Sequence, residues 1–414
     1  MKPEASSLSI AKRRSIGLLS LATFSSMAAQ RVCDAMLPEL SRVFAVSLGQ
    51  AAQVVSVFAI VYGVLQLFYG PLGDRLGKFR VIAFATLACS FGNLLALLVS
   101  GLDGLLVSRA LVAMGAAAII PLSLAWIGDS VPAKEVQETL ARVGLGTTLG
   151  VGGGQLVGGL LTDTLGWRWA FAFLALLFCV VGALLLDDLG RQRKALGLQG
   201  AGGAPAAGPA RGPYLAQVRA ILGLRWTRVI LLVGLAEGAA GFGALAIWAA
   251  HLHRALGFSL SAAGAVVALF GVGGMLYMVL ARQLIRRMHP RELVRLGGVL
   301  VFVSALVIAL TPVAWPTIPA SLVAGFGFFT FHNVMQANAT QMAPAARGTA
   351  VSLFAASLFL GQSLGVQLAA SLVDRLGSAP VIAMGGTVLL ALGFLFAGAL
   401  RQRENGLASA AAPS

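Results

Sequence analysis

The sequence is poor in charged residues, and acids are the scarcer kind. Asp, Glu, Lys and Arg make up 11% of the 414 residues, whereas a soluble domain carries about 25%. Hydrophobic residues reach 58%, which is more apolar surface than a soluble fold can hide. The composition therefore excludes an ordinary soluble protein and predicts an all-α membrane protein.

Cysteine and the usual enzyme motifs are also scarce. The three cysteines, Cys33, Cys89 and Cys179, lie in apolar runs without metal-ligand spacing, so we interpret them as small core residues. A phosphate-binding loop is missing, which argues against direct use of ATP. The loops contain neither a Cys/His cluster nor a plausible hydrolase triad, so we expect no enzymatic activity, no metal and no cofactor.

Long apolar runs make up most of the chain, and each approaches the ~20 residues that a membrane-crossing helix needs. The first run is too long, and too polar at its far end, for a cleaved signal. The twelve predicted spans are Ser15–Leu37, Ala51–Tyr69, Val81–Ser100, Gly104–Ile127, Gln137–Thr162, Trp167–Leu186, Val229–Ala250, Ser259–Ala281, Val294–Thr311, Thr317–Thr340, Thr349–Val373 and Pro380–Leu400.

The basic residues indicate the orientation of these spans. The net charge is +15, and the bases lie in short segments beside the apolar runs. With the N-terminus inside, 24 Lys and Arg fall on the cytoplasmic side, four fall outside and two fall within spans. Such an excess is typical of cytoplasmic loops, so we expect both termini in the cytoplasm. We expect these bases to meet anionic lipid headgroups and not nucleic acid.

The most specific stretch joins the second and third spans. It reads Gly70-Pro71-Leu72-Gly73-Asp74-Arg75-Leu76-Gly77-Lys78-Phe79-Arg80 and is predicted to be a short loop. Its bases alone fit any cytoplasmic loop, but the order G-x-L-x-D-R-x-G-K-x-R is more specific. It resembles the loop signature of the major facilitator superfamily of transporters. That resemblance implies two six-helix bundles that work by alternating access.

Two contacts of this loop are expected to control the conformation. Asp74 is predicted to bind the N-terminal turn of the eleventh span, near Gly348–Ala350, where unpaired N–H groups carry positive charge. One base of the loop is predicted to pair with Asp129, at the inner end of the fourth span. The resemblance implies that both contacts favour the outward-facing state. The residues expected to act in gating are Gly70, Asp74, Arg75, Gly77, Lys78, Arg80 and Asp129.

An internal repeat with a constant offset of 211 positions relates the fifth span to the eleventh. Spans six helices apart have the same orientation, so this is a parallel repeat with a substrate site expected between its halves. In the second copy Ile285 stands where the first has Asp74. The matching residues are Gly150, Gly154, Leu161, Asp163, Leu165 and Gly166 in the first copy and Gly361, Gly365, Leu372, Asp374, Leu376 and Gly377 in the second.

The repeat divides the chain into an N-terminal bundle over residues 1–190, a cytoplasmic linker over 191–227 and a C-terminal bundle over 228–414. Within the linker, Gln199–Pro213 is rich in Gly, Ala and Pro and is predicted to be flexible. Tyr214–Arg228 has apolar residues at helical spacing with arginines between them. It is predicted to be a helix on the membrane surface, with a plain solvated linker as the alternative.

Glycines crowd the fifth span, and small residues let helices approach closely in lipid. The order Gly150-x-x-x-Gly154-Gln155-x-x-Gly158-Gly159 also resembles the fifth-span signature of proton-coupled antiporters. The family has proline where this chain has Gln155, and an upstream glycine where it has Ala141. The resemblance implies proton-driven export. The alternative is a tight helix interface, and Gln155 is expected to present its amide to the cavity.

Five ionisable residues fall inside predicted spans, where a central charge costs about 2.5–3.5 kcal/mol, so they are functional candidates. They lie in spans one, four, seven and ten, which line the central cavity in the superfamily that the chain resembles. Local signatures support two of them, because R-A-L-V-A-M-G from Arg109 and D-A-M-L-P from Asp34 resemble those of the family's fourth span and of its drug and sugar exporters. The five residues are Arg31, Asp34, Arg109, Glu237 and His332.

We expect these residues to form two groups. Arg31, Asp34 and Arg109 are predicted to meet in the outer part of the N-terminal half, as a substrate and proton site or as a static ion pair. His332 is predicted to face Glu237, unless it is an ordinary core histidine. Proton coupling is assigned to Asp34, Arg109 and Glu237. The predicted cavity residues are Arg31, Asp34, Arg109, Gln155, Glu237, His332, Asn333 and Gln336.

The sequence thus favours a proton-coupled exporter of a small molecule such as a drug, sugar or metabolite. An importer, symporter or facilitator on the same fold remains the alternative. A membrane receptor would need large soluble domains or long tails, which the sequence lacks. The expected partners are a small-molecule substrate, protons and membrane lipids. We expect a monomer that crosses the cell's inner membrane many times.

Overall fold

The computed structural model describes residues 10–195, 214–343 and 346–411, and every regular element in these ranges is a helix. The predicted flexible segment Gln199–Pro213 lies outside the described residues. The elements are α1 Ile10–Val43, α2 Leu48–Ala51, α3 Gln53–Leu76, α4 Lys78–Leu98, α5 Leu102–Ser130, α6 Ala133–Thr164, α7 Trp167–Ala195, α8 Tyr214–Gly223, α9 Arg225–Glu237, η1 Gly238–Phe242, α10 Gly243–Leu256, α11 Leu260–Arg287, α12 Pro290–Leu310, α13 Thr317–Gln341, α14 Arg347–Leu376 and α15 Ser378–Ala411.

Ten helical stretches among the described residues are long and apolar enough to cross a membrane. Here α2 and α3 form one stretch, and α9, η1 and α10 form another. Helices α1 and α6 are also long, but they fall short in hydropathy. Their sequences explain this, since α1 carries ionisable and hydroxyl side chains along its length and α6 is rich in glycine.

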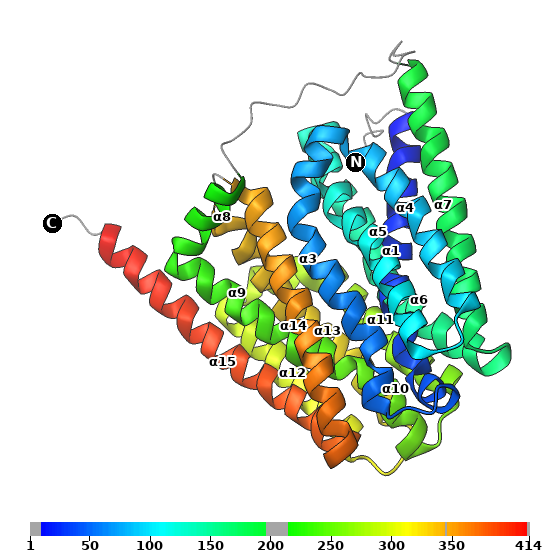
Figure 1. Ribbon diagram of the computed structural model, residues 1–414. Helices are drawn as coiled ribbons and strands as arrows, with labels where there is room; N and C mark the ends of the chain where they lie inside the picture. The colour runs from blue at the N-terminus through cyan, green and yellow to red at the C-terminus, as the bar shows by residue number, and fades with distance from the viewer. Residues whose placement is uncertain (1–9, 196–213, 344–345, 412–414) are drawn as a thin grey trace, which may run out of the picture.

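The helices fall into two groups, α1 to α7 and α9 to α15, with most packing contacts inside each group. The groups meet chiefly along two helix pairs, α6 with α11 and α3 with α14. Figure 1 shows the groups spreading apart toward the end that carries α8 and both ends of the described chain. We call this the open end of the molecule and the opposite one the closed end.

Glycine spacing explains how α6 packs. A Cβ on Gly146, Gly150, Gly154 or Gly158 would collide with a backbone oxygen of α1. The tight helix interface expected for the fifth span is therefore present. The second copy of the repeat packs in the same way, because a Cβ on Gly361 would meet the carbonyl oxygen of Leu235. A Cβ on Gly150 would meet the carbonyl oxygen of Phe24, and Phe24 lies 211 positions before Leu235.

The two groups touch from the closed end to about the middle of the helices. The Ser56 and Ser363 hydroxyls, on α3 and α14, lie 2.9 Å apart. A Cβ on Gly152 of α6 would lie 2.9 Å from the backbone oxygen of Ala268 on α11. Nearer the open end, a Cβ on Gly144 would meet nothing within 4 Å. The halves are therefore joined from the closed end to about the middle of the helices.

Two local predictions need correction. The predicted loop Gly70–Arg80 is mostly helical, because α3 continues to Leu76 and α4 begins at Lys78. Gly77 alone breaks the helices, at a φ of 90° that side chains disfavour. Among the cysteines, Cys33 and Cys89 are buried as expected, but Cys179 is exposed. Apolar surface is normal on a helix that faces lipid, so an apolar run does not imply burial there.

Candidate functional site

The first buried polar cluster joins α1 to α6 in the N-terminal half. Arg31 and Asp34 are one helical turn apart, and the guanidinium Nη1 lies 3.3 Å from the carboxylate Oδ2. The same oxygen accepts a hydrogen bond of 2.8 Å from the Gln155 amide. All three side chains are essentially fully buried. Gln155 is thus a neighbour of the carboxylate, which the sequence pattern alone did not predict.

Arg109 makes no direct contact with this ion pair, although the three side chains were expected to meet. Its Nε donates to the carbonyl oxygen of Val54 at 3.4 Å, and its guanidinium carbon lies 4.3 Å from the centre of the Phe58 ring. Both terminal nitrogens are buried without a hydrogen-bond partner. Arg109 is nevertheless close enough to Asp34 for their charges to interact. Among the described residues of this half, it is the buried charged group with the most unpartnered nitrogen atoms.

Arg31 also reaches across to the other half of the molecule. Its guanidinium carbon lies 4.2 Å from the centre of the Phe242 ring, a cation–π geometry. Phe242 ends η1, a π-helical turn that directly follows Glu237. Such turns insert one extra residue into a helix and are frequent at functional sites. The turn could be suspected from the sequence only through the two glycines and two alanines among its five residues.

The second buried cluster lies in the C-terminal half and joins α9 to α13. His332 Nδ1 is 2.8 Å from Glu237 Oε1, as the predicted pairing requires. Glu237 is fully buried, and its other oxygen has no hydrogen-bond partner. The His332 ring stacks on Phe328 at 5.8 Å between centroids, and Phe354 lies 5.9 Å away. An acid and an imidazole thus share an aromatic environment.

The other predicted residues on α13 do not join this pair. The Asn333 amide donates to the carbonyl oxygen of Phe329, one turn earlier on its own helix. Gln336 is exposed, toward the open end of α13. Among the described residues, no group of three His, Cys, Asp or Glu side chains is arranged to hold a metal.

Around the signature stretch, one of the two predicted contacts is present. Lys78 Nζ lies 2.6 Å from Asp129 Oδ2 and 2.8 Å from Asp74 Oδ1, so the predicted ion pair with Asp129 forms. Arg75 is exposed, and Arg80 lies 6.0 Å from the Phe84 ring. Gly70 lies in open space.

The contact between Asp74 and the start of α14 does not form in this conformation. The Thr349 hydroxyl, in the first turn of α14, instead donates to the Gln217 side-chain oxygen of α8 at 3.1 Å. Separation of the halves at the open end accounts for this difference, because Asp74 and Thr349 belong to opposite groups of helices.

Two carboxylates bridge the halves at the closed end. Asp163, at the end of α6, accepts hydrogen bonds from the backbone N–H groups of Leu260 and Ser261 at 3.2 and 2.5 Å. Asp374, at the end of α14, accepts from the Ser47 hydroxyl at 2.7 Å and the Gly49 N–H at 3.4 Å. Each carboxylate therefore caps the N-terminus of a helix in the opposite half, where the helix dipole favours negative charge.

Sequence reasoning marked these two aspartates only as members of the repeat. Their offset of 211 positions was the available signal, since a polar residue kept in both copies of an apolar repeat needs a shared role. A further cross-half contact, between the buried amides of Gln30 and Gln362 at 3.2 Å, had no such signal.

Comparison with known sequences finds one family profile and several relatives. The profile of the Major Facilitator Superfamily matches residues 19–366. The inner membrane transport protein YnfM of Escherichia coli (strain K12) is 26% identical over 150 residues, which are 36% of each chain. The probable multidrug resistance protein EmrY of the same strain is 26% identical over 153 residues, 37% of this chain and 30% of EmrY. The chain thus matches about a third of the length of these relatives.

Comparison with solved structures extends the similarity to nearly the whole chain. A bacterial homologue of the human lysosomal transporter Spinster, in an inward-facing and unoccupied conformation, has a TM-score of 0.70 at 18% identity, covering 95% of this chain and 96% of that one. The nucleoside transporter NupG has a TM-score of 0.69 at 12% identity, covering 92% and 98%. At such low identity the similarity shows a shared fold.

Proposed function

Because the chain belongs to the Major Facilitator Superfamily, we propose that this multi-pass membrane protein exports a small molecule in exchange for protons. The observation that carries this proposal is a buried acid in each half. Asp34 and Glu237 are fully buried, and each keeps one oxygen without a partner. Burial favours a neutral carboxyl group, and a nearby guanidinium favours a charged one. A rearrangement that changes the neighbours of either acid therefore changes its affinity for a proton.

The proposed topology has twelve spans, with α1 and α6 among them. Residues 1–190 and 228–414 form the two bundles, and both termini lie in the cytoplasm. The open end then faces the cytoplasm, and the conformation described here is inward-facing. Reporter fusions after Gly101 and Gly200 test this arrangement, because they should report opposite compartments. The same compartment for both would rule out the twelve-span topology.

Alternating access follows from the contacts at the two ends. Rocking of the halves would break the bonds of Asp163 and Asp374 at the closed end. It would bring Asp74 toward Thr349 at the open end, where a helix N-terminus favours its charge. The two sets of contacts exclude each other, so the substrate site is open to one side at a time.

Export is the direction we favour. The glycine order of α6 resembles that of proton-coupled antiporters, and the name of the relative EmrY refers to multidrug resistance. Competition between a substrate and a proton for one acid is the simplest coupling for exchange. An importer or facilitator on the same fold is the second candidate, and Gln155, in place of the proline of those antiporters, is the observation that supports it.

Transport by the purified protein in proteoliposomes tests the proposal. A ligand-protection screen first identifies a compound that raises the melting temperature, since ligands stabilise the state that binds them. Flux of that compound is then measured with and without an imposed pH gradient. Uphill movement against the direction of proton flow supports export. Movement with the protons supports a symporter, and flux that ignores the gradient supports a facilitator.

A further inference from the structure

Helix α8 has two different faces. One face of α8 packs against the C-terminal half. Ile221 on this face is only 3% exposed and lies among the core residues around Phe331. The opposite face is uncovered. Leu215 and Leu222 lie on it at 79% and 41% exposure, and Arg219 lies between them along the same stripe. Positions i, i+4 and i+7 form one side of a helix, so these side chains share a surface.

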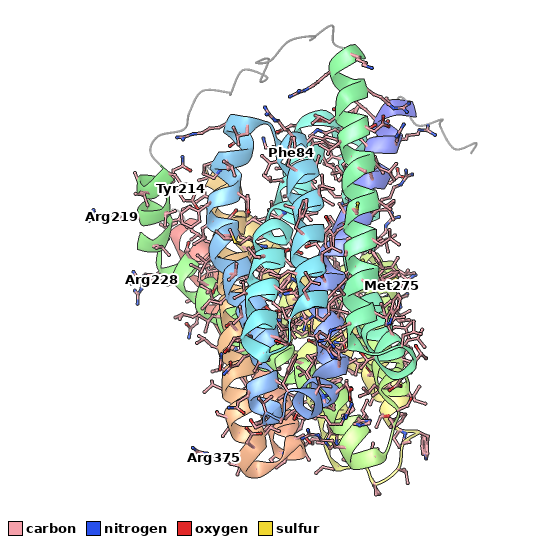
Figure 2. The ribbon with its side chains drawn as sticks, turned by 45° about the vertical axis from the view of Figure 1, so that its right-hand side comes forward. Phe84, Tyr214, Arg219, Arg228, Met275 and Arg375 are labelled. Carbon is pink, nitrogen blue, oxygen red and sulfur yellow. The ribbon has the colours of Figure 1, made fainter. Side chains whose placement is uncertain are left out.

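Arginines continue this surface into the start of α9. Arg225 and Arg228 are exposed, and Figure 2 shows Arg219 and Arg228 pointing away from the protein on the same side. Among the described residues, no carboxylate lies within ion-pair distance of any of the three. Arg228 donates to the carbonyl oxygen of Gly223, at 3.3 Å. A surface with leucines and unpaired positive charge is suited to an anionic, partly apolar partner.

The position of α8 identifies that partner. Leu224 alone separates α8 from the membrane span that begins at Arg225, so α8 lies level with the end of a span. Helices with exposed leucines and arginines lie in this interface, with the apolar side chains among the acyl chains. The fitting partner is the headgroup layer of an anionic leaflet.

The docked face connects α8 to the moving parts of the protein. Gln217 on this face accepts the hydrogen bond from Thr349, in the first turn of α14. That turn is where Asp74 is proposed to bind in the outward-facing state. The far end of α14 carries Asp374, which bridges the halves at the closed end. One helix, α14, therefore links α8 to both sets of contacts.

We propose that anionic phospholipids bind Arg219, Arg225 and Arg228 and thereby hold the protein in its present conformation. Lipid fixes α8 at the membrane surface, and the bond between Gln217 and Thr349 keeps the start of α14 away from Asp74. A ligand shifts a conformational equilibrium by its difference in affinity for the two states. Each base near an anionic surface strengthens attraction about fivefold, so three give about a hundredfold.

The experiment uses the full chain in nanodiscs of phosphatidylcholine with increasing phosphatidylglycerol. Spin labels on Gly128→Cys and Gly398→Cys, in a Cys179→Ser background, report the distance between the halves. A side chain at either glycine meets nothing within 4 Å. Native mass spectrometry counts the bound phosphatidylglycerol. We expect anionic lipid to increase the population with the halves far apart at the labelled end.

Three variants make the test decisive. The triple variant Arg219→Gln, Arg225→Gln, Arg228→Gln should lose about a hundredfold in lipid affinity together with the distance response. The matched control Arg282→Gln, Arg286→Gln, Arg287→Gln removes equal charge from exposed positions on α11 and should keep the distance response. Gln217→Ala should keep lipid binding and lose the distance response.

Several outcomes would overturn the proposal. A full response in the arginine triple variant would show that these residues are not the lipid site. A full response in Gln217→Ala would show that the contact with Thr349 does not transmit it. Glycerol phosphate added to pure phosphatidylcholine nanodiscs should have no effect, because it cannot engage the leucines. An effect equal to that of the lipid would contradict a membrane surface as the partner.

Discussion

The two halves of this protein keep the same residues where they pack and differ where they bury charge. Gly150 and Gly361 occupy the same place in the repeat, and both let a helix pass close to a backbone oxygen. Asp163 and Asp374 also correspond, and both cap a helix of the opposite half. The shared architecture therefore extends to the contacts that hold the closed end together.

The buried charges follow no such symmetry. An offset of 211 positions takes Asp34 to Leu245 and Arg109 to Ala320. It takes Arg31 to Phe242, and these two side chains contact each other across the halves. A residue that touches its own counterpart lies near the axis relating the halves. Packing has thus been retained in both copies, while the chemistry at the centre has been divided between them.

The largest expected effect separates the two buried acids. Asp34→Asn can still accept the hydrogen bond from Gln155, but it no longer binds and releases a proton. Substrate binding should therefore persist. Gradient-driven flux should fall at least about tenfold, which is the free-energy equivalent of one pKa unit. Glu237→Gln tests the other half in the same assay. If Asp34 carries the proton alone, the Glu237→Gln protein retains coupling.

The double variant provides the decisive control for this comparison. If both single variants and the double variant keep full gradient-driven flux, neither acid carries the proton. Protein stability must be measured alongside, because removing one partner of a buried ion pair costs about 3–5 kcal/mol. Arg31→Gln, which disrupts the same pair from the other side, should show that stability loss without removing an acid.

A smaller effect tests whether packing is equivalent in the two halves. Gly150→Ala and Gly361→Ala each force a methyl group into a backbone oxygen, and such overpacking typically costs ~1–3 kcal/mol. Gly144→Ala is the matched control, because its methyl group meets nothing and alanine favours helix by up to ~1 kcal/mol. Thermal melting in one detergent compares the three. Equal losses at the two repeat positions would support the symmetry, and a loss at Gly144 would contradict the packing explanation.

The closed-end bridges should also respond alike. Asp163→Asn and Asp374→Asn each weaken an interaction with a helix N-terminus, worth about 0.3–2 kcal/mol, and should each shift the equilibrium away from the present conformation. Spin-label distances across the closed end measure the shift. Asp103→Asn, an exposed acid in the first turn of α5, serves as the control. A response to only one of the two variants would break the proposed equivalence.

Much of this architecture followed from the sequence because it depends on local composition. Apolar runs are long, and the repeat is visible at one offset, so the order of the helices could be predicted. The glycine spacing of α6 indicated a close interface but not its partner, because a stripe of small residues fits any nearby helix. The predicted loop around Asp74 proved helical because Gly77 alone can make the turn.

The site was harder to predict because its contacts connect distant elements. The pair of Glu237 and His332 could be expected from two ionisable residues on cavity helices. The separation of Arg109 from Asp34 could not be predicted, because it depends on whether the folded protein places the guanidinium beside the carboxylate or over the Phe58 ring. The π-helical turn after Glu237 also depends on packing, because Gly238 lies against the backbone of α14.

The smallest expected effect concerns the position where the repeat has lost its acid. Asp74→Asn leaves the present closed-end contacts intact and removes only the exposed pair with Lys78, which is worth about 0.2–1 kcal/mol. It should act on the other state, by removing the attraction between Asp74 and the start of α14. The loss of the pair with Lys78 acts in the opposite sense, so the equilibrium should move toward the conformation with the open end apart by less than the ~0.3–2 kcal/mol of the helix-end contact. Ile285→Asp places an acid at the matching position of the second half. It should produce a smaller shift, because Arg286 and Arg287 beside it are exposed to solvent.

Disulfide crosslinking of Asp74→Cys with Thr349→Cys measures how often these positions meet. A pair that never crosslinks, with or without substrate and at any pH, would remove the Asp74 contact from the mechanism.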